Sequence, residues 1–406
     1  MKKRRVVVTG LGLITPVGIG VKESWKNILN GVSGITNITK FDVSDFKSKV
    51  AGEVKNFNPD LYLNPKDSRR MDTFIQFGLV AGIEAIKDSG LEVTEENAER
   101  IGVSIGSGIG GINLIETTSD NFDQGGPRKV SPFFVPGTII NMISGNLSIM
   151  YGLKGPNISI VTACTTGTHS IGDASRMIEY GDADVMIAGG SEAAITELTV
   201  AGFSAAKALS QRNDDPSTAS RPWDKDRDGF VIGEGAGVMV IEEYEHALKR
   251  GAKIYCELGG YGMSADAYHI TAPSIDGPKR SMINAINNAG INLDEVSYIN
   301  AHGTSTPLGD LNEANAIKET FNKHAYHLVV NSTKSMTGHL LGGAGGIESV
   351  FTALAIHHQV SPPTINIFNQ DPECDLDFAA NEAKEINRSE ERRVGKECRS
   401  RWSPYH

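Results

Sequence analysis

The chain has 406 residues, 39% of them hydrophobic and 22% charged, which is the composition of a folded globular protein long enough for two domains or one duplicated unit. A formal net charge of −10 argues against a nucleic-acid-binding protein, because affinity for phosphate comes from clustered Lys and Arg. No segment approaches the roughly 18 consecutive apolar residues of a membrane span, and the basic first five residues lead into a strand rather than a signal-peptide core, so we expect a cytoplasmic protein with no membrane contact.

The four cysteines are few for so long a chain, and none stands in C-x-x-C spacing. The pattern predicts neither a disulfide framework nor a zinc site, and we expect no bound metal. The number and spacing of the cysteines remain compatible with a single reactive thiol.

Short β-branched segments alternate with helical ones along the chain, which is typical of a layered α/β architecture. Most of these segments are apolar on both faces, so we expect sheets covered on both sides by helices. A second series begins near Lys253, after a helical segment over 242–250, and indicates a duplicated fold. The predicted strands are 5–8, 102–105, 158–162, 185–188, 298–301 and 328–331.

Two glycine patterns resemble nucleotide-binding loops. The first has Gly10 and Gly12 after a strand, but Thr15 stands where the third glycine belongs. The second, over 106–111, matches G-x-G-x-x-G, yet no strand ending in an acid follows about 20 residues on. We therefore interpret both as tight turns.

The segment before Cys164 predicts a buried strand that runs into a turn of small residues and then a helix. A side chain at a helix N-terminus is close to unpaired N–H groups, which favour a thiolate and can bind an oxyanion. An ordinary buried cysteine is the alternative on this segment alone.

The acidic segment 224–229 begins like a calcium loop, but its twelfth position is Gly235 and the nearby Glu234 comes one residue early. The following residues, 236–241, predict a strand where a calcium loop needs a helix. We therefore reject a calcium site.

Two histidines stand in matching contexts at the ends of predicted strands. His302 is followed by Gly and hydroxyl residues, and His339 comes shortly before an Ala/Gly-rich helix. Because α/β proteins build their sites at the C-terminal ends of strands, the pair favours a functional site over two structural histidines.

The last 19 residues, 388–406, have no apolar periodicity and a sudden excess of Arg. They resemble the translation of a sequencing adapter, and we expect them to form no core strand. This segment holds six Lys or Arg and three Asp or Glu, so the rest of the chain carries −10 − 3 = −13.

Three motifs together resemble the β-ketoacyl-(acyl-carrier-protein) synthases of the elongating kind: VTACTTGTHSIGDA, NAHGTSTPLGD and NSTKSMTGHLLGGAGGIES. The resemblance runs from about Arg5 to Phe378. It implies the thiolase-like fold, a duplicated αβαβα five-layer sandwich that is usually a homodimer, with an N-terminal half over 1–252 and a C-terminal half over 253–387. Similar enzymes end in a Gly-Phe-Gly-Gly loop and paired strands, in whose place this chain has the adapter-like tail, so we expect the C-terminal strands to be truncated.

The resemblance also implies a reaction. Cys164 takes an acyl group from acyl carrier protein (ACP), and His302 and His339 then stabilise the enolate formed as malonyl-ACP loses CO2. The product is 3-oxoacyl-ACP in fatty acid elongation. The enzyme needs no cofactor of its own, since 4′-phosphopantetheine is carried by ACP.

Further roles follow only from the resemblance. Lys334 and Glu348 would hold His339, Thr304 and Thr306 would bind the pantetheine arm, and Asp310 would support the site. The residues matching an acyl pocket are Ile109, Phe134 and Phe203. A basic landing surface for acidic ACP would consist of Lys66, Arg69, Arg70, Arg128, Lys129, Lys207 and Arg212.

Three alternatives remain within the superfamily. A degradative thiolase needs a second reactive cysteine, and Cys374 lies among acids, which disfavour a thiolate. A starter-condensing synthase would show Asn in place of His339. A non-catalytic partner subunit of a polyketide ketosynthase would lack Cys164, but an inactive homologue or a polyketide-type ketosynthase stays open.

Overall fold

The structure is a computed structural model that describes residues 4–269, 273–386 and 401–402. Its main sheet joins seven strands in the order β14-β9-β1-β8-β7-β5-β6, and the short β2 pairs with β1 as an eighth. The strands are β1 (Val6–Thr15), β2 (Gly18–Ile19), β5 (Ile101–Gly106), β6 (Asn157–Ile158), β7 (Val185–Glu192), β8 (Gly235–Glu243), β9 (Cys256–Leu258) and β14 (Arg401–Trp402). The sheet is mixed, because β5 runs parallel to β6 and β7, whereas β8 runs antiparallel to β1 and β7.

Side chains on the central strands alternate between two hydrophobic cores, as the two-residue repeat of a strand requires. Along β7, Val185 and Ile187 enter the core beside α3 (Thr73–Ser89) and α6 (Met142–Tyr151). Met186 and Ala188 enter the opposite core beside α7 (Thr166–Tyr180) and α13 (Ala344–His358). The sheet is thus apolar on both faces, as the sequence predicts.

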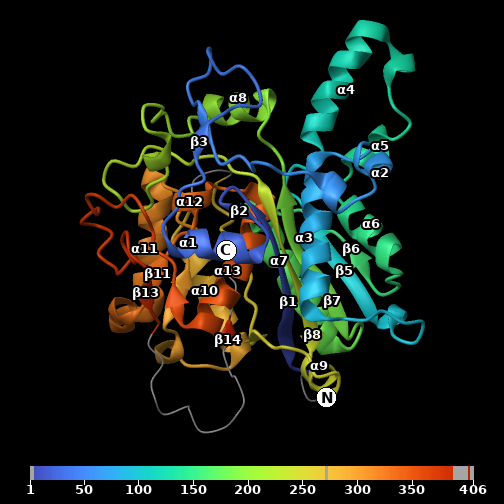
Figure 1. The fold of residues 1–406 in the computed structure, drawn as a ribbon. Helices are drawn as coiled ribbons and strands as arrows, with labels where there is room; N and C mark the ends of the chain where they lie inside the picture. The colour runs from blue at the N-terminus through green and yellow to red at the C-terminus, as the bar shows by residue number, and fades with distance from the viewer. Residues whose placement is uncertain (1–3, 270–272, 387–400, 403–406) are drawn as a thin grey trace.

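A second, smaller sheet pairs β10 (Tyr298–Asn300) in parallel with β11 (Val329–Asn331). It packs in a third core with α10 (Asp276–Ala289) and α11 (Pro307–Phe321), which lie on the side of the molecule away from the main sheet (Figure 1). Helices α7 and α13 lie between the two sheets, so the order of layers is helix, sheet, helix, sheet, helix.

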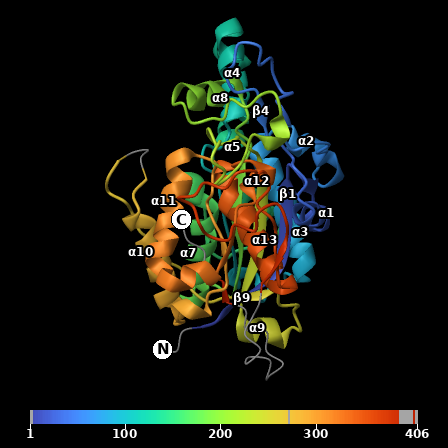
Figure 2. The same ribbon diagram turned by 90° about the vertical axis from the view of Figure 1, so that its left-hand side faces the viewer.

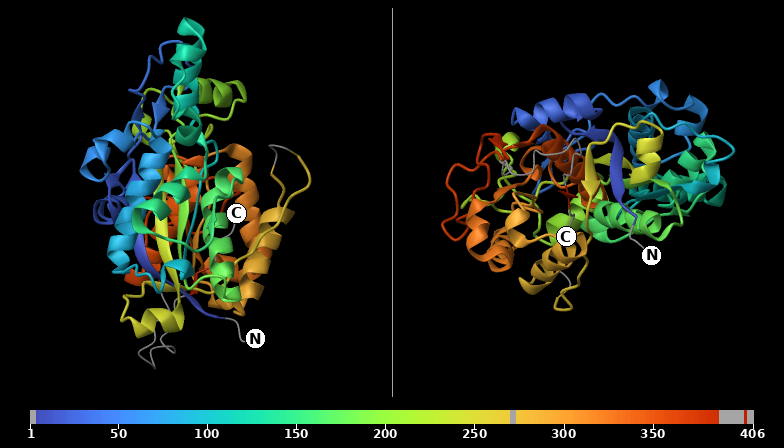
Figure 3. Two further views of the ribbon diagram at one scale, coloured as in Figure 1. Left: turned by 90° about the vertical axis from the view of Figure 1, so that its right-hand side faces the viewer. Right: turned by 90° about the horizontal axis from the view of Figure 1, so that it is seen from below.

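The remaining elements are short and mostly peripheral. Two small antiparallel pairs join β3 (Thr36–Asn37) to β4 (Val50–Ala51) and β12 (Val360–Ser361) to β13 (Lys384–Glu385). Helix α4 (Ile112–Gly125) projects from one end of the molecule in Figures 1 and 3 and has no buried residue. The other helices are α1 (Val21–Leu29), α2 (Pro65–Ser68), α5 (Phe134–Thr138), α8 (Glu197–Ala205), α9 (Tyr244–Lys249) and α12 (Lys334–Thr337).

The prediction of a tight turn at Gly10 and Gly12 is wrong, since both lie inside the ten-residue strand β1. Their role is close packing: a Cβ at Gly12 would lie 1.9 Å from the Ala81 carbonyl oxygen of α3. The second pattern does form a turn, with Gly110 at φ +79°.

The predicted buried strand 158–162 is also wrong in length. Only Asn157–Ile158 forms a strand, and Val161 is 52% exposed. The reason is position: β6 ends the sheet with β5 as its one neighbour in the described part of the chain, so pairing beyond it is missing.

The start of one helix and the end of the chain complete the comparison with the predicted elements. The helix expected over 242–250 begins at Tyr244, because β8 continues to Glu243, whose carboxylate caps the helix by accepting the His246 N–H at 2.8 Å. The tail was predicted to form no core strand, and Arg401–Trp402 forms only a two-residue strand that pairs with β9 at the edge of the main sheet. The rest of 388–406 lies outside the described residues.

Candidate functional site

Cys164 lies in a one-turn segment, η4 (Ala163–Thr165), directly before helix α7. The preceding Ala163 has φ +51°, a conformation that non-glycine residues rarely adopt. The hydroxyl of Thr166 accepts the Thr162 N–H at 2.9 Å and thereby holds the turn closed. The thiol is half-buried at the helix N-terminus, which is the placement that the sequence predicts.

His339 approaches this thiol from the other half of the chain. Its Nε2 lies 3.0 Å from Cys164 Sγ. Its backbone is fixed because its N–H donates to the Val231 carbonyl at 2.7 Å, and its carbonyl accepts the Gly233 N–H at 2.8 Å. The ring also packs edge-on against Phe230, at 5.5 Å between ring centroids.

The position of the ring proton on His339 follows from its second nitrogen. The backbone N–H of Leu341 donates to Nδ1 at 3.3 Å, so Nδ1 is an acceptor. The neutral imidazole therefore carries its proton on Nε2, and this N–H points at the sulfur. A donor in this place can stabilise negative charge that develops beside Cys164.

His302 completes the group at the C-terminal end of β10. Its ring is perpendicular to that of His339, with centroids 5.1 Å apart, and one ligand atom from each of Cys164, His302 and His339 lies within 4.8 Å of the others. The Glu313 carboxylate holds the backbone here by accepting the N–H groups of His302 and Gly303, each at 2.7 Å.

One sulfur and two imidazoles are also a donor set that zinc accepts. The hydrogen bond from Leu341 disfavours such a site, because a protonated Nε2 cannot ligate a metal. The expectation of no metal stays a prediction.

Lys334 and Glu348 form a buried ion pair close behind the histidines, with side chains 1% and 5% exposed. Figure 2 shows the two helices that carry them, α12 and α13, beside each other. The Lys334 charge lowers the pKa of Cys164, but burial outweighs it and raises that pKa to about 11. The expected preference for a thiolate is therefore wrong for the resting site: burial favours the neutral thiol.

The remaining supporting residues lie around the start of α11. The hydroxyls of Thr304 and Thr306 are 3.0 Å apart. Asp310 is fully buried and accepts the Trp223 N–H at 3.0 Å, and burial raises its pKa to about 7. Asp310 therefore joins this helix to the segment before β8.

A cluster of apolar side chains lies beside Cys164. The thiol and Phe203 both pack against a buried cluster that includes Phe230 and Leu341. Ile109 is 37% exposed in the turn after β5, and Phe134 begins α5 outside this cluster. Of the three residues predicted to line an acyl pocket, Phe203 packs against the same cluster as the thiol.

The seven basic residues predicted to bind a carrier protein lie on or beside α2, α4 and α8, which form the upper end of the molecule in Figure 1. Five are exposed, whereas Arg70 and Arg212 are half-buried. Arg70 stacks on Phe133 at 4.1 Å, and Arg212 donates to the Asp226 carbonyl at 3.2 Å.

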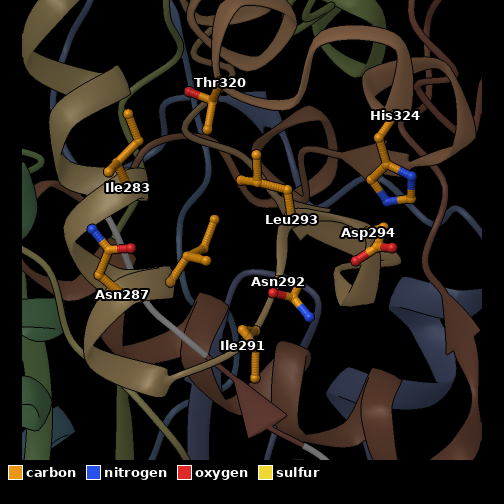
Figure 4. A pocket seen from close by; sticks show the side chains of 9 residues that line it. Ile283, Asn287, Ile291, Asn292, Leu293, Asp294, Thr320 and His324 are labelled. Atoms are coloured by element: carbon orange, nitrogen blue, oxygen red, sulfur yellow. The ribbon is translucent and has the colours of Figure 1, made fainter.

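The prediction missed three residues that shape the site: Glu192, Glu313 and Phe230. Glu192 ends a strand, Glu313 lies inside a helix and Phe230 forms an isolated bridge in a loop. All three are ordinary residue types that no spacing signal marks. A hollow of about 520 Å³ between α10 and α11, lined by residues such as Ile283, Leu293 and His324, contains none of the site residues (Figure 4).

Comparison with known proteins assigns the family. Residues 3–247 match the family model "Beta-ketoacyl synthase, N-terminal domain", and residues 255–368 match "Beta-ketoacyl synthase, C-terminal domain". The chain is 58% identical over 393 residues to 3-oxoacyl-[acyl-carrier-protein] synthase 2 of Vibrio cholerae, covering 96% of this chain and 95% of the relative. It is 54% identical over 388 residues to the protein of the same name from Staphylococcus aureus strain COL, covering 95% and 94%.

Solved structures of related proteins support the same family assignment. A type II PKS ketosynthase in complex with its acyl-carrier protein superposes with a TM-score of 0.88 at 37% identity, over 95% of this chain and 94% of that one. A β-ketoacyl synthase from Burkholderia phymatum gives 0.86 at 32%, over 94% of each chain. The layered architecture is thus the thiolase-like fold. With both domain models matched and relatives more than half identical over nearly the whole chain, this protein is a member of the β-ketoacyl synthase family.

Proposed function

We propose that this protein condenses acyl-ACP with malonyl-ACP to give 3-oxoacyl-ACP and CO2 in fatty acid elongation, and that Cys164, His302, His339 and Lys334 carry the reaction. The observation that supports these roles is the convergence of one sulfur and two imidazoles from the two halves of the chain, with Nε2 of His339 3.0 Å from Sγ of Cys164. The relatives at 54% to 58% identity are named 3-oxoacyl-ACP synthases, whereas the type II PKS ketosynthase is 37% identical, which favours the fatty acid reaction.

In the first half-reaction Cys164 attacks the acyl thioester. Since its pKa is about 11, the thiol must lose its proton as it attacks, and the departing carrier thiolate takes one up, so no net charge is created. The product is an acyl group on Sγ and a free carrier thiol.

In the second half-reaction the thioester oxygen of malonyl-ACP lies between the two imidazoles. As the carboxylate leaves as CO2, its bond electrons move onto this oxygen, where the Nε2–H of His339 and a donor from His302 stabilise the enolate. The carbanion then attacks the acyl carbon, and Sγ leaves and regains a proton from solvent. Lys334 and Glu348 hold the α12–α13 region around His339.

We also propose the supporting assignments that rest on the family. Thr304 and Thr306 bind the pantetheine arm of ACP, Ile109, Phe134 and Phe203 line the acyl pocket, and the enzyme works in the cytoplasm without a cofactor of its own. The chain is organised in two halves, 1–252 and 253–387. Across the described residues, no helix is long and apolar enough to cross a membrane.

A homodimer is supported by exposed apolar side chains on α4, α5 and α6 and by the short, open-edged β6. These side chains include Phe122, Val135, Ile149 and Met150, each at least 46% exposed. Exposed apolar surface is typical of a protein–protein interface where such side chains gather in one patch.

Cys374 does not support a thiolase reaction. It is fully buried in the core around α10 and α11, a different core from the one that contacts Cys164, and burial raises its pKa to about 12. A second catalytic thiol would have to reach the same substrate.

The test is to measure the two half-reactions separately in wild type, Cys164→Ala and His302→Ala. We expect Cys164→Ala to abolish acyl transfer from acyl-ACP. His302→Ala should keep acyl transfer within severalfold and lower malonyl-ACP condensation by about 100-fold, because one enolate donor is lost. Equal losses in both steps for His302→Ala would contradict the assigned role.

A further inference from the structure

Glu192 is the last residue of β7, and it is fully buried. Its carboxylate accepts five hydrogen bonds. The donors are the Ser107 hydroxyl (2.6 Å) and the backbone N–H groups of Gly108 (2.8 Å), Ile109 (3.1 Å), Gly110 (3.3 Å) and Gly342 (2.9 Å). Burial raises the pKa of Glu192, and the hydrogen bonds oppose this shift. Five donors around one carboxyl group match the ionised form, which can only accept.

These donors belong to two segments that are far apart in the chain. Four come from the turn over 107–110 that follows β5, and the fifth comes from η8 (Leu341–Gly343), just after His339. The segments touch, because a Cβ at Gly342 would lie 2.2 Å from the Gly108 nitrogen. The carboxylate therefore joins one half of the molecule to the other.

Both segments border the reacting sulfur. A Cβ at Gly108 would lie 3.5 Å from the carbonyl oxygen of Ala163, the residue before Cys164. On the other side, Gly342 follows Leu341, whose N–H sets the proton position on His339. A shift of either segment would change the geometry of Cys164 relative to His339.

No ion pair in the described part of the chain includes Glu192, although thirteen other carboxylates there pair with Lys, Arg or His. A buried charge without a counter-ion is costly unless its hydrogen bonds are complete. If Glu192 served only the stability of the fold, an apolar side chain at this position would lower the free energy cost of burial.

We propose that Glu192 is a positioning residue for the condensation: it clamps the 107–110 turn to the Gly342 turn and so fixes Cys164 and His339 relative to each other. This inference rests on the proposed function. It predicts an effect on the chemical step rather than on the binding of ACP, because the basic surface for ACP lies on other elements.

The test compares Glu192→Gln with Glu242→Gln. Glu242 is an equally buried carboxylate at the opposite end of the same strand pair, where it accepts bonds from Thr9, His246 and Arg250. In Glu192→Gln the amide nitrogen must face at least two N–H or O–H donors, since each carboxylate oxygen accepts two or more. We expect kcat for condensation to fall at least about tenfold, while KM for malonyl-ACP stays within twofold.

Glu242→Gln should lower the melting temperature but leave kcat within twofold. Equal kcat values for the two folded variants overturn the inference. If Glu192→Gln does not fold, Ser107→Ala is the deciding variant, because it removes one hydrogen-bond donor and keeps the carboxylate. A fall in kcat of more than twofold at constant KM supports the clamp. An unchanged kcat overturns it. Absence of condensation by the wild type would instead contradict the proposed function, so the two failures are distinguishable.

Discussion

The chemistry at Cys164 depends on two neighbouring groups whose effects only the folded chain reveals. The Leu341 N–H places the proton of His339 on Nε2, where it faces the sulfur. Burial keeps the thiol neutral at rest, with a pKa of about 11, and the Lys334 charge opposes this effect. The site therefore favours stabilisation of charge that forms during the reaction over a permanently ionised nucleophile.

Asp310 gives a prediction about pH at the residue scale. Burial raises its pKa from 3.8 to about 7, so between these values the native state holds a proton that the unfolded state has lost. The native state then binds more protons, and the free energy of unfolding should fall as pH rises through this window. Burial opposes ionisation of Asp310 more strongly than the Arg227 guanidinium, 3.6 Å away, favours it, so this contribution to stability is complete below pH 3.8 and lost above about pH 7.

The measurement is urea unfolding of wild type and Asp310→Asn at pH 5, 6, 7 and 8. Asn keeps the shape and an acceptor for the Trp223 N–H but does not titrate there. The stability of wild type relative to the variant should decrease steadily from pH 5 to pH 7. Parallel curves across this range would show that Asp310 is ionised in the native state throughout.

At the scale of elements, the close crossing of β1 and α3 determines how the main sheet is covered. Gly10 and Gly12 place the strand backbone against the helix backbone, with hypothetical Cβ atoms 2.2 Å and 1.9 Å from the carbonyl oxygens of Ala85 and Ala81. Backbone atoms on both sides cannot move aside as a flexible side chain can. The glycines therefore set the distance between these two layers.

Gly12→Ala should destabilise the protein by at least about 2 kcal/mol, because the added methyl group overlaps the α3 backbone. A matched control is Gly202→Ala in α8, where nothing lies within 4 Å of the new Cβ and φ is negative. This change should be neutral or stabilise by up to about 1 kcal/mol, since Ala favours a helix. Thermal unfolding of both variants checks the pair, and equal melting temperatures would contradict the packing argument.

At the scale of the whole molecule, an acidic protein is proposed to bind an acidic partner, so its basic residues have to be concentrated on one surface. The candidates lie at the end of the molecule that carries α2, α4 and α8 (Figure 1). Interactions between exposed charges steer association and weaken with salt.

Charge reversal at Lys66 and Lys207 should raise KM for acyl-ACP severalfold at low salt and leave kcat nearly unchanged. The control reverses Lys87 and Lys249, which are also exposed but lie near the C-terminus of α3 and in α9, at the opposite end of the molecule. Both variants change the net charge equally. A similar rise in KM for both would mean that net charge, not this surface, controls carrier binding.

The sequence predicts most of the fold because the apolar segments of β5, β7 and β8 are distinctive over a few residues. It fails where a local pattern has two structural uses. Glycines at alternate positions suit a turn or a close helix contact, and the apolar segment before Cys164 becomes a strand only as far as a neighbouring strand pairs with it.

The sequence by itself determined the family, the layered α/β class and the candidate nucleophile with its two histidines, because these depend on residue types in contiguous motifs. Only the tertiary structure decided which nitrogen of His339 faces the sulfur, how burial changes the pKa of Cys164, and that Glu192 joins two turns at the site. The contacts of Glu192 and of the Cys164 sulfur join groups more than 80 positions apart, and the pKa of Cys164 depends on the loss of water around the thiol. Leu341 is only two residues from His339, but the direction of its N–H depends on the folded backbone, so the sequence pattern does not reveal it.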